Sequence, residues 1–225
     1  MVSPTREEEA RIPLTRDRVL AAGIALADAD GIEALTMRRL AQALGVEAMS
    51  LYYHVANKDA LLVGMLDIVV TEMELPAREA PWKAAIRRSA ISAHAVLVRH
   101  PWACQLLVSG TGGPAPSRLR HMDAFLGCLR GGGFSVALTD HAYHALDSHI
   151  IGFTMWQLSF PFDTDEELLA VAGDFLRTLP VDEFPHLAEH VDYHLRPPTD
   201  DDPNEFDFGL DLILDGLERQ LLATV

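Results

Sequence analysis

Apolar residues recur at intervals of three and four positions along most of the chain, and no segment alternates as a half-buried strand would. Glycine and proline gather between these periodic segments, where they end helices and form turns. The pattern predicts an all-α fold, with helices over roughly 15–30, 36–44, 47–54, 57–74, 81–99, 101–109, 117–131, 136–160, 165–178, 184–195 and 205–222. At 225 residues, the chain is long enough for a small N-terminal domain and a larger helical one.

Two short predicted helices flank Gly45 and have the proportions of a helix-turn-helix. Ala41 is small enough to let these helices cross closely, and Gly45 tolerates the left-handed backbone that a tight turn often needs. With Leu51 and Val55 directed inward, the other side of the second helix is left to solvent. The side chains that we expect on this exposed side are Ala48, Met49, Ser50, Tyr52 and Tyr53.

These exposed residue types suit insertion into the major groove of DNA. Ala48 or Met49 can contact a thymine methyl group, while a serine and two tyrosine hydroxyls can reach bases or phosphates. The residues expected at the phosphate backbone are Thr36, Arg38 and Lys58. The same pattern is also typical of a helical hairpin whose tyrosines meet another protein, so spacing alone leaves both interpretations open.

The formal net charge of −15 is unfavourable for a DNA-binding protein, but the charge is unevenly distributed. Residues 1–60 carry seven basic and nine acidic side chains, whereas residues 61–225 carry eleven and twenty-four. The N-terminal segment is therefore close to neutral. We expect the acidic C-terminal part to weaken non-specific binding to DNA without excluding specific binding.

The sequences LTMRRLAQALGVE (35–47) and LYYHVANKDALL (51–62) carry a specific resemblance. Over about residues 14–65, the chain resembles the DNA-binding domain of the TetR family of repressors. The family's DNA-contact positions then fall on Arg38, Ala48, Met49, Ser50, Tyr52, Tyr53, His54 and Lys58. Met37, Ala48 and Met49 replace polar or proline residues of the tetracycline repressor, so a different operator is implied.

The segment 206–221, FDFGLDLILDGLERQL, has an apolar stripe at helical spacing. The stripe comprises Phe206, Leu210, Ile213, Leu217 and Leu221. It is consistent with the core of one chain or with an interface between two chains. The segment resembles the last helix of tetracycline-repressor-like C-terminal domains, which implies a four-helix dimer bundle with the predicted helix 136–160. A symmetric dimer would place two recognition helices about 34–36 Å apart.

The predicted helix 136–160 mixes polar and aromatic residues with apolar ones. Asp140, Tyr143 and Asp147 share one face, with His144 beside them. Pockets between helices are typically apolar with a few convergent polar groups. The residues that we assign to a small-molecule pocket are Ser89, Trp102, Met122, Phe125, Tyr143, His144 and Asp147. The tryptophan, methionine and phenylalanine would equally suit an ordinary core.

The resemblance implies a homodimeric repressor that a small-molecule effector releases from a palindromic operator. Release would follow from movement of the predicted helix 57–74, which changes the spacing of the recognition helices. The tetracycline repressor holds its drug through a magnesium ion, with a histidine and polar partners. The matching positions here are Glu74, Ser89 and Leu107, which do not provide that chelating set. The effector's identity is therefore open, and no cofactor is expected.

Two groups of histidines indicate an alternative function for the chain, as a metal-dependent enzyme or a metal-binding protein. One group recurs every four residues and comprises His186, His190 and His194, with Glu189 nearby. A second group comprises His141, His144, Asp147 and His149. The sequence has no His-Glu-x-x-His spacing, no glycine-rich phosphate loop and no nucleophile elbow. We therefore expect no catalytic site and no metal site.

The predicted organisation is an N-terminal arm (1–13), a helix-turn-helix domain (14–60) and a ligand-binding and dimerisation domain (61–225). Residues 1–10 are polar and acidic, unlike a signal peptide, and the longest uncharged stretch, roughly 148–162, is too short to span a bilayer. Cys104 and Cys128 form neither a disulfide framework nor a zinc set. These features predict a cytoplasmic protein with no membrane partner.

Overall fold

The computed structural model describes residues 13–110, 115–160, 165–196 and 204–223, and all regular structure within these ranges is helical. This confirms the all-α prediction. The elements are α1 (Arg16–Asp30), η1 (Ile32–Ala34), α2 (Met37–Leu44), α3 (Ala48–Leu51), α4 (Lys58–Thr71), α5 (Trp82–Arg99), α6 (Pro101–Ser109), α7 (Pro116–Gly131), α8 (Val136–Leu158), α9 (Asp165–Thr178), α10 (Pro185–His194) and α11 (Glu205–Ala223). None of the described helices is long and apolar enough to cross a membrane.

Short-range capping sets the starts of the N-terminal helices. The side chains of Thr15, Thr36 and Asn57 each accept a hydrogen bond from the backbone amide three residues later, at 3.2, 3.2 and 2.8 Å. These bonds satisfy amides that have no partner within the helix. Gly45 ends α2 with φ 67° and ψ 33°, a left-handed conformation that glycine adopts without a Cβ penalty.

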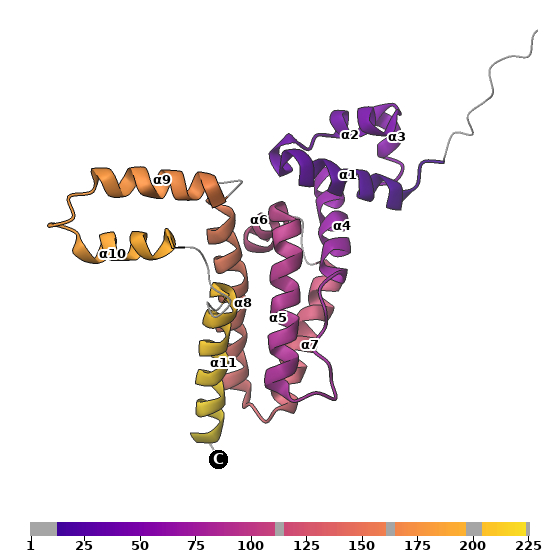
Figure 1. Cartoon of the computed structure of the whole chain (residues 1–225). Coiled ribbons are helices and arrows are strands. Elements are labelled where there is room, and N and C mark those ends of the chain that lie inside the picture. Colours follow the sequence, from indigo (N-terminus) through magenta and orange to yellow (C-terminus); the bar gives the residue numbers. More distant parts are fainter. Residues whose placement is uncertain (1–12, 111–114, 161–164, 197–203, 224–225) are drawn as a thin grey trace, which may run out of the picture.

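Helices α1, α2 and α3 form a small unit, from which α4 runs into the larger part of the molecule (Figure 1). α4 packs on α1 at one end and on α7 further along. The buried core is continuous across this junction, because Leu20 and Leu40 belong to the same apolar cluster as Val70 and Leu97. The two units therefore share α4 as a common structural element, and the predicted boundary at residue 60 falls within this helix.

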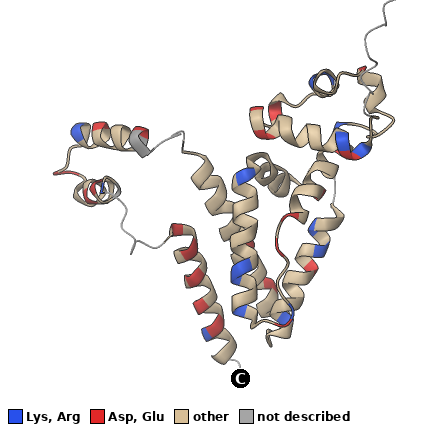
Figure 2. Cartoon of the chain, turned by 45° about the vertical axis from the view of Figure 1, so that its right-hand side comes forward, with Lys and Arg blue, Asp and Glu red and all other residues tan. Residues whose placement is uncertain are grey.

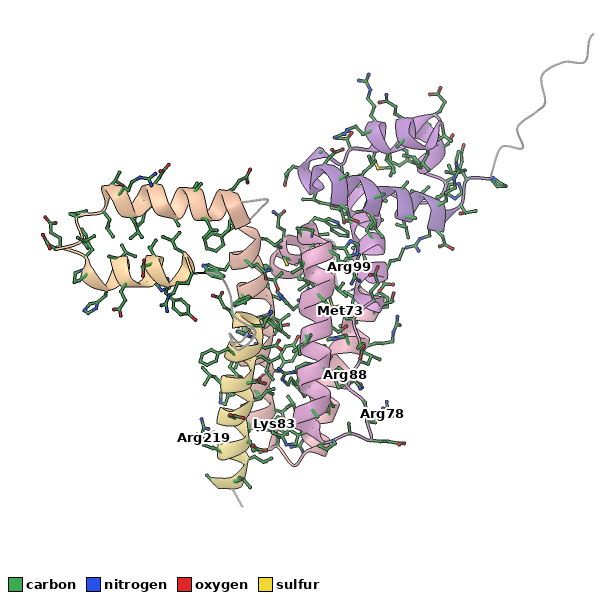
Figure 3. The ribbon with its side chains drawn as sticks, in the orientation of Figure 1. Met73, Arg78, Lys83, Arg88, Arg99 and Arg219 are labelled. Carbon is green, nitrogen blue, oxygen red and sulfur yellow. The ribbon has the colours of Figure 1, made fainter. Side chains whose placement is uncertain are left out.

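In the larger part, α5 packs against α7, α8 and α11. Basic residues of α5 face acidic residues of α11 (Figure 2), and Lys83 lies toward α11 (Figure 3). Lys83 pairs with Asp215 at 2.7 Å, and Arg87 pairs with Asp207 at 2.9 Å and with Asp211 at 2.7 Å. Exposed pairs of this kind add little to stability, because solvent screens them. Much of the acidity of α11 is thus balanced within the chain.

Helices α9 and α10 pack on each other as a hairpin that projects away from α5 (Figure 1). Several of its apolar side chains are exposed, among them Phe175, Phe184 and Leu187. The hairpin therefore has apolar surface that the described part of the same chain does not cover.

Gly132 provides a test of the packing between α5 and the end of α7. A Cβ at this position would lie 2.7 Å from Cγ of Trp82, whose ring packs edge-on against Phe134 at 4.8 Å. Gly132→Ala should therefore destabilise the protein by about 1–3 kcal/mol, because the tryptophan ring must shift. Urea unfolding at a constant protein concentration measures this change.

The control is Gly127→Ala, in the interior of the same helix, where an added Cβ meets nothing within 4 Å. This substitution should stabilise the protein by up to about 1 kcal/mol, because alanine has the higher helix propensity. A Gly132→Ala variant as stable as the wild type would contradict the close packing of Trp82.

Candidate DNA-binding face and ligand pocket

The short helix α3 and its flanking residues form the candidate DNA-binding face. Tyr53 is 88% exposed and Met49 is 71% exposed, while Tyr52 is less exposed. The backbone-contact candidates are also exposed; they are Thr36, Arg38 and Lys58. Ser50 and His54 are half-buried. The surface thus presents aromatic, thioether and basic side chains together, and these can contact base edges and phosphates.

The structure corrects two details of this face. Helix α3 ends at Leu51 rather than near residue 54, and the amides of His54 and Val55 both donate to the Leu51 carbonyl, at 2.9 and 3.0 Å, in a turn. Ala48 is half-buried against the core, so the prediction that it is fully exposed was wrong. Ala48 and Leu51 are three residues apart and lie on the same side of the helix.

Arg38 and Arg39 are adjacent but have different surroundings. Arg39 pairs with Asp30 at 2.7 Å and donates to the Ala34 carbonyl at 3.3 Å, so it joins α2 to the end of α1 and to η1. Arg38 makes no such pair among the described residues and remains exposed. Its guanidinium is therefore available for a phosphate.

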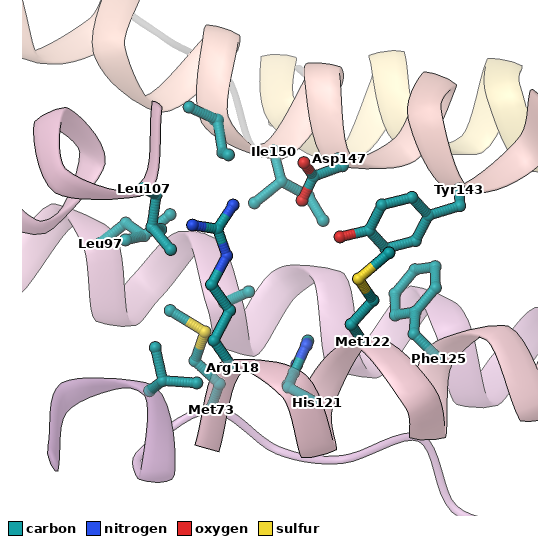
Figure 4. Close-up of a pocket in the computed structure, with 13 residues that line it drawn as sticks. Met73, Leu97, Leu107, Arg118, His121, Met122, Phe125, Tyr143, Asp147 and Ile150 are labelled. Atoms are coloured by element: carbon teal, nitrogen blue, oxygen red, sulfur yellow. The ribbon is translucent and has the colours of Figure 1, made fainter. Parts of the chain in front are cut away.

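A pocket lies in the larger part, between α4, α5, α6, α7 and α8 (Figure 4). Its volume is about 550 Å³, including the mouth that is open to solvent. Apolar side chains from all five helices form most of the wall. The polar members are Arg118 and His121 from α7 and Tyr143 and Asp147 from α8. An apolar cavity with a few convergent polar groups is typical of a small-molecule site.

The structure brings four of the predicted pocket residues together, namely Met122, Phe125, Tyr143 and Asp147. The other three lie elsewhere. Ser89 is buried and donates to the Glu74 carbonyl at 2.7 Å. Trp102 is buried and its indole nitrogen donates to Asp28 at 2.6 Å. His144 is exposed and lies 3.6 Å from Asp140. None of these three lines the pocket, although the Ser89 hydroxyl lies 3.5 Å from Nε2 of the lining residue His121.

Arg118 and His121 are pocket residues that the sequence analysis missed. Arg118, Met122 and Phe125 have the spacing i, i+4, i+7 of one helix face, and His121 is one turn from Arg118. Extending the face already assigned to Met122 and Phe125 by one turn would have identified both.

Burial changes the acid–base properties of this pocket. It raises the pKa of the Asp147 carboxyl, against the opposing effects of Arg118 and His144. Burial, with Asp147 nearby, also raises the pKa of Tyr143. Burial lowers the pKa of His121. In all three cases the shift favours the neutral form of the side chain.

The histidine groups do not form a metal site among the described residues, where no set of three potential ligands comes together. On α8, His141 and His144 are exposed, Asp147 lines the pocket, and His149 lies 2.9 Å from the Phe206 carbonyl. On α10, the side chain of His194 lies outside the described residues. The α8 set is therefore divided among three surroundings, so it does not support the alternative function of a metal-binding protein.

The apolar stripe of α11 faces its own chain. Phe206, Leu210 and Leu217 are buried against the rest of the chain, and Ile213 and Leu221 pack at the edge of the same core. The structure therefore places Phe206, Leu210 and Leu217 in the core of their own chain, while Ile213 and Leu221 keep part of their surface exposed. The opposite side of α11 carries exposed apolar residues instead: Phe208 (55% exposed), Leu212 (57% exposed) and Leu222.

Comparison with known proteins finds two family matches that together cover most of the chain. Residues 19–65 match the model described as bacterial regulatory proteins, tetR family. Residues 75–221 match the model described as tetracyclin repressor-like, C-terminal domain. The first range contains the candidate DNA-binding face, and the second contains most of the pocket.

Individual relatives agree with these matches. The HTH-type transcriptional repressor DrrR1 of Streptomyces coeruleorubidus is 34% identical over 217 residues, which cover 91% of this chain and 77% of that protein. Apo ActR from Streptomyces coelicolor has a TM-score of 0.75 at 27% identity, covering 95% of this chain and 99% of its own. ActR in complex with actinorhodin has a TM-score of 0.75 at 29% identity, covering 93% of this chain and 99% of that chain.

Proposed function

The chain belongs to the TetR family of bacterial regulatory proteins, and we propose that it is a dimeric repressor released from its operator when a small molecule fills the α4–α8 pocket. The observation that carries this proposal is the position of α4. Its first residue, Lys58, is exposed beside the DNA-binding face, and Val70 near its other end lines the pocket. One rigid element thus connects the two sites.

The proposed DNA contacts follow from exposure on and beside α3. Tyr53, Met49 and Tyr52 would reach base edges, and Lys58 and Arg38 would bind phosphates. The amide end of α2, capped by Thr36, adds a further phosphate site. Since bacterial DNA lies in the cytoplasm, we propose that the protein acts there.

The proposed dimer uses the exposed side of α11 together with α8. Phe208, Leu212 and Leu222 project from α11, while Gly152 and Trp156 are exposed on α8. Burying such apolar area between two copies is favourable, and glycine lets helices approach closely. A two-fold axis along this face would present two copies of α3 to successive major grooves, about 34–36 Å apart.

A second connection joins the units beside α4. Asp28, on α1, accepts the hydrogen bond from Trp102 on α6, and its carboxylate lies 2.8 Å from Nδ1 of His100. Leu107, on the same helix α6, lines the pocket. A ligand that moves α4 or α6 would therefore move α1 and the attached recognition helix. Release requires that the ligand bind the DNA-free arrangement more tightly than the DNA-bound one.

The relatives support a small-molecule effector. DrrR1 is a transcriptional repressor, and ActR has been crystallised with actinorhodin. TetR-family regulators are in general non-enzymatic DNA-binding proteins, and we propose no catalytic activity for this chain.

The test is selection of genomic DNA fragments that the full-length protein retains, followed by binding measurements on the selected sequence. We expect a short palindromic site, bound by a dimer, whose affinity falls steeply as salt concentration rises. Compounds made by the products of neighbouring genes would then be tested for release of that fragment. If no fragment were enriched over input DNA, the proposed function would be wrong.

A further inference from the structure

We propose that the pocket binds a planar, mostly apolar ligand with one ionised oxygen group, such as a carboxylate, phenolate or enolate, and that Arg118 binds this group. The inference rests on the proposed function and specifies its ligand class. It follows from the unpaired guanidinium in the pocket and from the apolar walls.

The guanidinium of Arg118 extends from α7 into the pocket (Figure 4). Among the described residues it has no hydrogen bond and no ion pair, although the chain contains 33 acidic residues. The cations of α5 differ, since Lys83 and Arg87 are paired with carboxylates of α11. A half-buried guanidinium without a protein partner is available for two oxygen atoms of a bound ligand.

Asp147 lies on α8, across the pocket from Arg118 (Figure 4), but forms no ion pair with it. Burial shifts the Asp147 carboxyl toward its neutral form, and it does the same to His121. Arg118 carries a permanent charge that no described carboxylate pairs, so its guanidinium is free to bind an anionic group of a ligand. The Tyr143 hydroxyl can donate a further hydrogen bond to a ligand oxygen.

The other residues that line the pocket suit an aromatic ring system in the ligand. Phe125 and Tyr143 pack edge to face, with ring centroids 5.9 Å apart and an interplanar angle of 83°. The planes of the two rings are therefore nearly perpendicular. Met73 and Met122 stand on other sides of the cavity. Methionine side chains adapt readily and contact aromatic rings favourably. The pocket can therefore adjust around a flat ring system while Arg118 holds its charged end.

The test uses matched probes that differ only in charge: 2-naphthoate and 2-naphthamide, and anthraquinone-2-carboxylate and its amide, with 2-naphthylmethylammonium as the cation. Binding to the full-length protein is measured by calorimetry. We expect each carboxylate to bind at least about tenfold more tightly than its amide, and the cation to bind weakly. In Arg118→Gln this preference should disappear, and in Arg118→Lys it should be partly retained.

Arg120→Gln is the matched control, because Arg120 is exposed on the same helix and does not line the pocket. It should keep the wild-type preference, and thermal unfolding should show that all variants are folded. The inference is overturned if no carboxylate binds more tightly than its amide, if the cation binds best, or if the preference survives in Arg118→Gln. Operator binding without ligand is measured in parallel, so that loss of operator binding counts against the proposed function alone.

Discussion

Leu212→Arg should convert the protein into a monomer that no longer binds a palindromic operator at concentrations that saturate the wild type. Leu212 is 57% exposed on the outer side of α11, so the substitution leaves the core of a single chain intact. In the proposed dimer, the two-fold axis would bring two arginines into one apolar interface. Burying these unpaired charges costs more than the interface can offset.

Light scattering coupled to gel filtration measures the mass, and a gel-shift assay measures operator binding. The control is Leu119→Arg, since Leu119 is an exposed leucine on α7, away from α11. This variant should remain dimeric and bind the operator. A Leu212→Arg protein that elutes as an intact dimer would show that the exposed side of α11 is not the interface.

Leu217→Arg has a different expected outcome, although Leu217 lies on the same helix. Leu217 is only 9% exposed and belongs to the core of its own chain. Arginine at this position would disrupt folding rather than separate two folded chains. The contrast between positions 212 and 217 therefore distinguishes the outer side of α11 from its inner side.

Tyr53→Ala should weaken operator binding by about tenfold to a hundredfold without changing the stability of the protein. At 88% exposure, Tyr53 makes little contact with its own chain, so its ring and hydroxyl are available to DNA. Fluorescence anisotropy with labelled operator measures the affinity, and thermal unfolding measures the stability. Tyr193→Ala, at a partly exposed tyrosine of α10, is the matched control and should bind operator as the wild type does.

Lys58→Ala tests the phosphate contact separately. The substitution should weaken binding to specific and to non-specific DNA by a similar factor. The slope of log affinity against log salt concentration should become smaller by about 1. Tyr53→Ala should leave that slope nearly unchanged. Unaltered operator binding in both variants would remove α3 and the start of α4 from the DNA interface.

The helices and their ends could be predicted from the sequence because both depend on local interactions. The caps at Thr15, Thr36 and Asn57 involve an amide only three residues away, and the left-handed turn at Gly45 depends on that residue alone. The candidate DNA-binding face lies within such a local motif. Met49, Tyr52 and Tyr53 were therefore identified correctly as exposed, whereas Ala48 and Ser50 are half-buried.

The sequence alone could not determine what covers each helix face. Periodicity shows that Phe206, Leu210 and Leu217 share an apolar side, but both a neighbouring helix and a second chain satisfy that pattern. The tertiary structure places α5 and α8 against this side, so the outer side of α11 is left for a partner.

The sequence by itself determined the helical architecture, its main boundaries, the DNA-binding motif and the family. The pocket depended on tertiary structure, because its lining comes from five helices spread between residues 70 and 151. Only their packing directs Arg118 into the cavity and Trp102 toward Asp28 instead. Neighbours along a helix follow from its 3.6-residue period, whereas contacts between helices depend on how the whole chain packs its core.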